Sequence, residues 1–170
     1  MRNLLLLIIA AAFSVQSLNA QESNNGKNIW ADSFLNETAP EIQVEQWLSE
    51  EPNFDGKFIL VEFWATWCGP CRKAIPKLNA WHEKFADDLV VMCISDEKAE
   101  KVSLMVNPKI EYYNAIDTRA LTKTKVNVQG VPHAILMTPD KKVIWEGFPL
   151  LPGHELTEEI IADLIEKYKK

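Results

Sequence analysis

The chain has 170 residues, the size of one domain, and it carries 24 acidic against 18 basic residues for a formal net charge of −6. The sequence contains no basic run, so nucleic acid is not an expected partner. An acidic chain of this length can bury a sizeable core without structural disulfides, so its three cysteines need another explanation.

The first 29 residues are expected to lie outside the folded domain. Arg2 precedes an apolar run from Leu4 to Phe13, which is shorter than the ~20 residues that a bilayer-spanning helix needs. The pattern predicts a signal peptide over residues 1–20 and a flexible polar tether over 21–29, with an uncleaved N-terminal anchor as the alternative. We therefore expect an exported protein of the periplasm or cell envelope, soluble after signal cleavage or membrane-tethered without it.

Residues 30–170 are predicted to form one α/β domain. Alternating polar and apolar residues over 41–47 predict a half-buried strand. The apolar runs 58–64 and 89–95 predict central strands covered on both faces. The remaining elements follow from periodicity and turn residues: helices over 72–86, 98–106, 117–125 and 156–168, and short strands over 112–116, 134–137 and 143–145.

The segment Trp67-Cys68-Gly69-Pro70-Cys71 stands where strand 58–64 gives way to helix 72–86. This spacing places both sulfurs in the first helical turn, close enough for a small-loop disulfide with one thiol exposed and one behind it. Unpaired N–H groups and the positive end of the helix dipole favour a thiolate there, and a thiolate is the attacking species in disulfide exchange. The pattern indicates a redox pair, although a bare CxxC is also half of a zinc site.

The segment Phe63 to Lys73 (FWATWCGPCRK) resembles the active-site segment of the thioredoxin superfamily. More narrowly, it is similar to the TlpA/ResA-type extracytoplasmic thiol-disulfide oxidoreductases. The resemblance reaches Gly130-Val131-Pro132 and covers roughly residues 38 to 168. It implies a thioredoxin fold, which is a central mixed sheet flanked by helices, with an N-terminal β extension over 30–48 and a helix-strand insertion over about 97–117.

The resemblance also implies a role for each site residue. Cys68 would be the exposed nucleophile that attacks a substrate disulfide, and Cys71 would resolve the mixed disulfide with Glu62 as its proton acceptor. Pro132 would follow a cis bond that aims the Val131 backbone at the substrate chain, which could then pair as an extra strand. Two further residues, Trp67 and Pro70, would complete the substrate-binding rim.

Glu62 interrupts an otherwise apolar strand. If it is buried there, desolvation should raise its pKa, whereas the alternative is a side chain that reaches a sheet edge or pairs with a lysine. The lysine that thioredoxin usually has on the adjoining strand is missing from residues 90–94. Many TlpA/ResA-type proteins carry a glutamate three residues after the second cysteine, where this chain has Ala74, so proton handling should depend on Glu62.

Two other residues have competing interpretations. Cys93, in an interior strand, is expected to be a small buried apolar residue, and a third redox thiol or an intermolecular disulfide is the alternative. His133 stands where the family commonly has Thr, and it either faces a neighbouring part of the core or touches the site and adds pH sensitivity. No cofactor and no metal site are expected.

A Gly-Pro pair between the cysteines resembles the reducing branch of the superfamily. We therefore expect a monomeric protein-disulfide reductase that acts on disulfide-containing exported proteins, apocytochrome c among them, and that is re-reduced by a membrane electron donor. The alternatives are a thiol oxidant or disulfide isomerase, and a metal carrier that uses the two thiolates of the CxxC motif.

Overall fold

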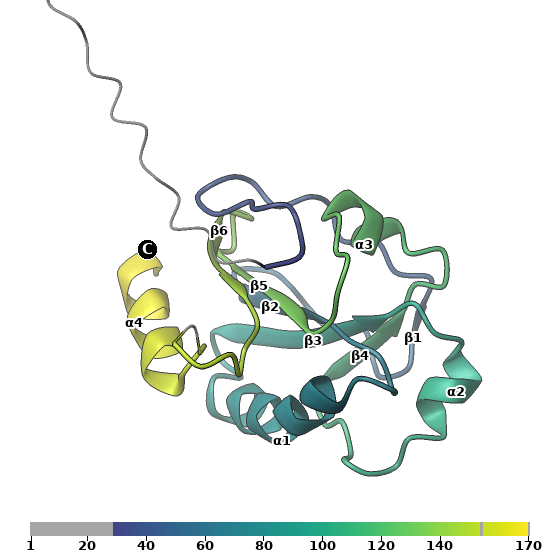
Figure 1. Cartoon of the computed structure of the whole chain (residues 1–170). Coiled ribbons are helices and arrows are strands. Elements are labelled where there is room, and N and C mark those ends of the chain that lie inside the picture. The colour runs from purple at the N-terminus through teal and green to yellow at the C-terminus, as the bar shows by residue number, and fades with distance from the viewer. Residues whose placement is uncertain (1–28, 154, 170) are drawn as a thin grey trace, which may run out of the picture.

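The computed structural model describes residues 29–153 and 155–169 (Figure 1). The predicted signal peptide over 1–20 and the tether up to residue 28 lie outside these residues. Ile29, the last residue of the predicted tether, is buried, so the packed part of the chain extends at least one residue beyond the predicted 30–170 domain. Across the described ranges, no helix combines the length and hydrophobicity needed to cross a membrane.

A six-stranded mixed sheet forms the centre of the domain. Its order is β1-β4-β3-β2-β5-β6, with β2, β3 and β4 parallel and the other three strands antiparallel to their neighbours. The strands are β1 Gln46–Trp47, β2 Phe58–Phe63, β3 Leu89–Ser95, β4 Tyr113–Ile116, β5 His133–Met137 and β6 Val143–Gly147. This sheet confirms the predicted α/β class, and the two apolar runs are its central strands, as their continuous hydrophobicity requires.

Helices cover one face of the sheet more fully than the other (Figure 1). The helices are α1 Gly69–Lys84, α2 Ala99–Ser103, α3 Leu121–Lys125 and α4 Glu158–Tyr168. Buried residues of α1, α2 and α4 pack in one apolar cluster on the first face. The second face is covered by residues that follow α3 and by the N-terminal segment 29–45, which contains no helix.

The N-terminal extension is less regular than the resemblance implied. The predicted strand 41–47 is reduced to β1, and the rest of the expected β extension over 30–48 has only an isolated bridge between Thr38 and Lys142. The reason lies in a distant side chain. Thr122 Oγ1 accepts the backbone N–H of Gln43 at 2.7 Å and donates to the Gln43 carbonyl at 2.6 Å. A hydroxyl group from α3 therefore takes the place of a partner strand at this point.

Candidate active site

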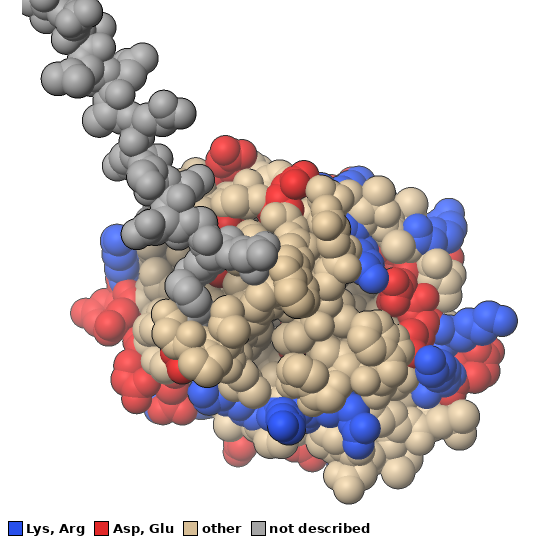
Figure 2. Space-filling view, viewed as in Figure 1, with Lys and Arg blue, Asp and Glu red and all other residues tan. Residues whose placement is uncertain are grey.

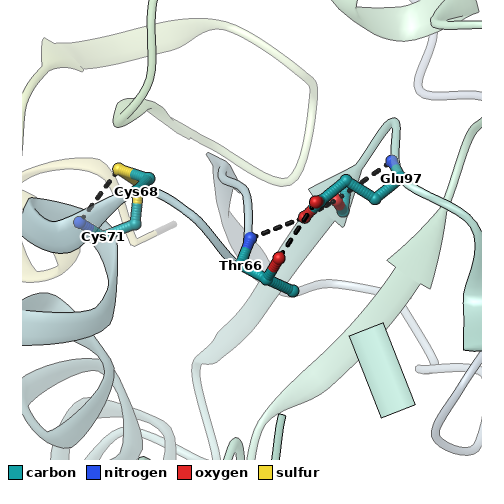
Figure 3. Close-up of a disulfide and its surroundings, with 5 residues drawn as sticks. Thr66, Cys68, Cys71 and Glu97 are labelled. Carbon is teal, nitrogen blue, oxygen red and sulfur yellow. Dashed lines mark hydrogen bonds between the residues drawn. A yellow bond between two sulfur atoms is a disulfide. The ribbon is translucent and has the colours of Figure 1, made fainter. Parts of the chain in front are cut away.

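The cysteine pair lies at the junction of β2 and α1 (Figure 3). Cys68 is the residue before the helix, and its Sγ accepts the backbone N–H of Cys71 at 3.2 Å. Pro70 follows within the first turn, where backbone N–H groups have no acceptor within the helix, so the N–H that proline lacks costs no helical hydrogen bond. Cys68 and Cys71 form a disulfide with their Cα atoms 5.3 Å apart, as the spacing predicted.

Both cysteines are buried, so the predicted exposure of Cys68 is wrong for this disulfide form. Cys71 is 0% exposed and Cys68 is 2% exposed. Cys68 belongs to the apolar cluster on the α1 face, and Val131 from a loop far along the chain packs against that cluster. Cys68 still keeps the little exposed surface that the pair has, which is consistent with its assignment as the outer sulfur.

The predicted rim of the site is brought together from two segments. The Val131–Pro132 bond is cis, as expected, and both residues line a groove that Pro70 lines from α1. Trp67, next to Cys68, is 68% exposed. Three of the four expected rim residues therefore share one groove, and the fourth is an exposed aromatic side chain beside the disulfide.

A carboxylate that the sequence did not single out fixes the loop before the cysteines (Figure 3). Glu97, just after β3, accepts the backbone N–H of Thr66 at 2.5 Å and the Thr66 hydroxyl at 2.9 Å. Burial alone would raise the pKa of Glu97, but its contacts with Lys101 and Thr66 hold that pKa below its usual value. An available signal was that parallel strands end at one edge of a sheet, which places residues after β3 near residues after β2.

Glu62 is fully buried beneath the α1 helix. It lies opposite Cys93 of β3 and Ala134 of β5 in the sheet register, and alternation along β2 points it to the same face as Leu60. Burial raises its pKa to about 8. Neither carboxylate oxygen has a hydrogen-bond partner among the described residues, so the alternatives of an edge position or a lysine partner are wrong.

Tyr112 is the polar neighbour of Glu62, and no sequence pattern indicated it. Its side chain is buried, and its hydroxyl opposes the rise in the Glu62 pKa without meeting the full geometry of a hydrogen bond to the carboxylate. Cys93 completes this buried group. Its Sγ lies 3.4 Å from Asn114 Oδ1, and burial raises the pKa of its thiol well above the usual value. The expectation of a small buried residue at Cys93 is confirmed, because such a thiol stays protonated and inaccessible.

His133 does not touch the cysteine pair. Alternation along β5 places it on the face opposite Ala134, where its ring stacks on Phe63 at 6.1 Å and meets Phe148 edge-on at 6.4 Å. Burial lowers its pKa to about 4, so the ring is neutral at physiological pH. Of the two interpretations, the neighbouring part of the core is the correct one.

In the part of the chain that the structure describes, no third ligand accompanies the two cysteines. Within residues 29–153 and 155–169, no group of three or more His, Cys, Asp or Glu side chains is placed to hold a metal ion. The arrangement instead provides a reversible disulfide at a helix N-terminus, with a buried acid on the same side of the sheet as the inner sulfur.

Comparison with known proteins agrees with this geometry. The Thioredoxin family model matches residues 41–116, which include Glu62 and the cysteine pair. The thioredoxin-like protein YneN of Bacillus subtilis is 29% identical over 92 residues, covering 52% of this chain and 54% of YneN. The thiol-disulfide oxidoreductase ResA of the same organism is 24% identical over 170 residues, covering 98% of this chain and 89% of ResA.

A solved structure gives the same result for the fold. The thioredoxin domain of a thiol-disulfide oxidoreductase from Bacteroides vulgatus has a TM-score of 0.62 and 23% identity, over 80% of this chain and 98% of that one. The matched part of this chain spans about half the length of YneN but nearly all of the Bacteroides domain. The expected mixed-sheet fold is confirmed.

Proposed function

The chain belongs to the thioredoxin superfamily, among its ResA-like thiol-disulfide oxidoreductases, and on that premise we propose that it reduces disulfides of exported proteins. The observation that carries the proposal is the Cys68–Cys71 disulfide at the start of α1, on the sheet face under which the unpaired acid Glu62 is buried. This combination supplies an attacking sulfur, a resolving sulfur and a proton acceptor.

The reaction begins with both cysteines reduced. The Cys68 thiolate attacks one sulfur of the substrate disulfide, forming a mixed disulfide and releasing the other substrate sulfur as a thiolate that takes up a proton. Cys71 then attacks Cys68 Sγ, which frees the second substrate thiol and closes the Cys68–Cys71 disulfide. Two electrons and two protons pass to the substrate, and the protein is left oxidised.

The surroundings of each sulfur support these roles. Cys68 precedes α1, so the free N–H groups and the dipole of a 16-residue helix favour its thiolate form. Cys71 is fully buried and has to lose a proton before it can attack. Because the pKa of Glu62 is about 8, roughly a tenth of the molecules carry the ionised carboxylate at pH 7, and this form can accept the proton and later return it.

We infer the direction of electron flow and the location from two features of the sequence. Gly69 and Pro70 between the cysteines favour the reducing direction, and the predicted signal peptide over 1–20 supports a periplasmic or envelope location. A reductant in an oxidising space needs a source of electrons, for which we propose a membrane thiol-disulfide carrier. Cytochrome c maturation is one setting that fits, with the haem-binding cysteines of an apocytochrome as substrate and the protein acting as a monomer.

Insulin reduction tests the activity. Cys68→Ser and Cys71→Ser should each abolish cleavage of insulin disulfides, whereas the matched control Cys93→Ala should retain it. Cys71→Ser should also accumulate substrate adducts on Cys68, because the resolving sulfur is missing. Full turnover by either serine variant would refute the proposal.

The reduction potential separates the reductant from its rivals. Equilibration with glutathione should give a value well below that of strong periplasmic oxidants, which is about −120 mV. A measured value near that figure would show that the protein is an oxidant, and a value near about −180 mV would be that of an isomerase. Binding of one copper or zinc ion per reduced protein, with no insulin cleavage, would instead support a metal carrier.

A further inference from the structure

An apolar groove of about 510 Å³ opens beside the cysteine pair. Pro70, Val131 and Pro132 form its near side, and Trp30, Phe148 and Leu151 are among the residues that form its far side. Among the residues that the structure describes, those that line it are all uncharged. Figure 2 shows this as a hollowed, uncharged area, with the basic side chains of α1 along its lower border.

The N-terminal segment contributes Trp30 to this groove, and several contacts hold Trp30 in place. The Trp30 carbonyl accepts the Gln129 N–H at 2.8 Å, and the indole ring of Trp30 meets the Phe148 ring edge-on, with the ring centroids 5.7 Å apart. The ring also covers Gly130 so closely that a Cβ atom there would lie 2.5 Å from Trp30 Cε3. Gly130 therefore allows Trp30 to pack directly on the loop that leads to Val131.

Trp30 has an unfavourable backbone conformation and an exposed side chain. Its φ of +48° is in the left-handed region, which is uncommon for a large side chain and tends to occur where function requires it. Even so, 55% of its surface is exposed, and Leu151 nearby is 39% exposed. Apolar side chains gathered at the mouth of a groove are typical of an interaction site.

The position of the groove identifies its occupant. A substrate segment that pairs with the Val131 backbone is extended, so side chains two residues apart point the same way. If the target cysteine points at Cys68, a residue two positions away points into the adjacent groove, which Pro70, Val131 and Pro132 share with the redox site. Because the lining is uncharged, a large apolar side chain is favoured at that position.

We propose that the groove between Pro70, Val131 and Trp30 is a specificity subsite that selects substrates with a large apolar side chain two residues from the reducible cysteine. This inference rests on the proposed function and deepens it. It assigns the N-terminal segment a part in substrate recognition, through Trp30, in addition to covering the sheet.

Matched peptides test the inference. Each test nonapeptide carries one cysteine as a mixed disulfide with 2-mercaptoethanol. One pair of peptides has Leu or Ser two residues before the cysteine, and a second pair has Leu or Ser two residues after it. Reduced protein in excess transfers two electrons to that bond, releasing the peptide thiol and mercaptoethanol and leaving the Cys68–Cys71 disulfide. We expect release from a leucine peptide to be about tenfold faster than from its serine counterpart. A factor of this size is what burial of one apolar side chain in a groove typically contributes.

The ratio of the two rates is the readout for variants. Trp30→Ala should bring the ratio close to one. Leu151→Ser changes another residue that lines the groove and should also lower the ratio, so it serves as a second test if Trp30→Ala does not fold. Leu104→Ala is the matched control, because Leu104 is 80% exposed and does not line the groove, so the ratio should not change.

Three results would overturn the inference. Equal rates for leucine and serine peptides on both sides would show that the groove does not select. A concentration-dependent dimer that Trp30→Ala abolishes would show that a second copy of the chain occupies the groove. Release from neither peptide would refute the proposed function itself, and the inference with it.

Discussion

Replacing Glu62 with glutamine tests the electrostatic basis of the site. The pKa of Glu62 is about 8 in the fold, against 4.5 for an ordinary glutamate. Below pH 4.5 both the folded and unfolded chains hold the proton. Between pH 4.5 and 8 only the folded chain keeps it, so stability falls as pH rises, and above pH 8 the loss is complete. At 1.36 kcal/mol per pH unit, the full loss is on the order of 5 kcal/mol.

Urea unfolding of the oxidised protein from pH 4 to pH 9 measures this effect. The difference in unfolding free energy between Glu62→Gln and the native protein should shift by about 5 kcal/mol in favour of the variant as pH rises. Taking the difference removes groups that titrate in both proteins, His133 included. Parallel pH profiles for the two proteins would refute the argument, because they would show that Glu62 titrates normally in the fold.

Three further predictions follow from neighbouring residues. Tyr112→Phe removes the hydroxyl that lowers the Glu62 pKa, so the pH window of stability loss should move upward in the same urea titration; an unchanged window would contradict this. Thr66→Val should cost about 1 to 2 kcal/mol of unfolding free energy and slow insulin reduction, because the loop before Cys68 loses its hydroxyl contact with Glu97. Unaltered stability would show that this contact contributes little. The native protein should lose about 3 kcal/mol of unfolding free energy as pH falls from 6.5 to 4, because the pKa of His133 is about 4 in the fold. His133→Phe should not show this loss. An acid-side profile identical to that of the native protein would refute this assignment.

The features that the sequence predicted correctly are local. The junction of β2 and α1 follows from an apolar run, two cysteines and a helical period within about 25 residues. The burial of Glu62 follows from its apolar neighbours on the same strand. Both depend on interactions close in sequence, which patterns represent well.

The features that were missed depend on distant parts of the chain. Cys68 was expected to be exposed, but it is buried in an apolar cluster against which Val131, more than 60 positions later, packs. Glu97 and Tyr112 come near the site because β3 lies beside β2 in the sheet and β4 follows on the other side of β3. The predicted strand over 41–47 is shortened to β1, because the Thr122 hydroxyl bonds the Gln43 backbone in place of a partner strand. The periodicity of the sequence cannot predict such contacts, because they depend on the order of the strands in the folded sheet.

The complete burial of Glu62 also constrains the timing of catalysis. An acid with no exposed surface cannot exchange its proton with bulk solvent while the α1 helix stays in place. Each turnover therefore needs a brief opening of the helix start, or a relay through the sulfurs, before the proton escapes. An opening of the helix start that limits turnover would make the overall rate fall as solvent viscosity rises, whereas a limiting proton relay would make it fall in deuterium oxide.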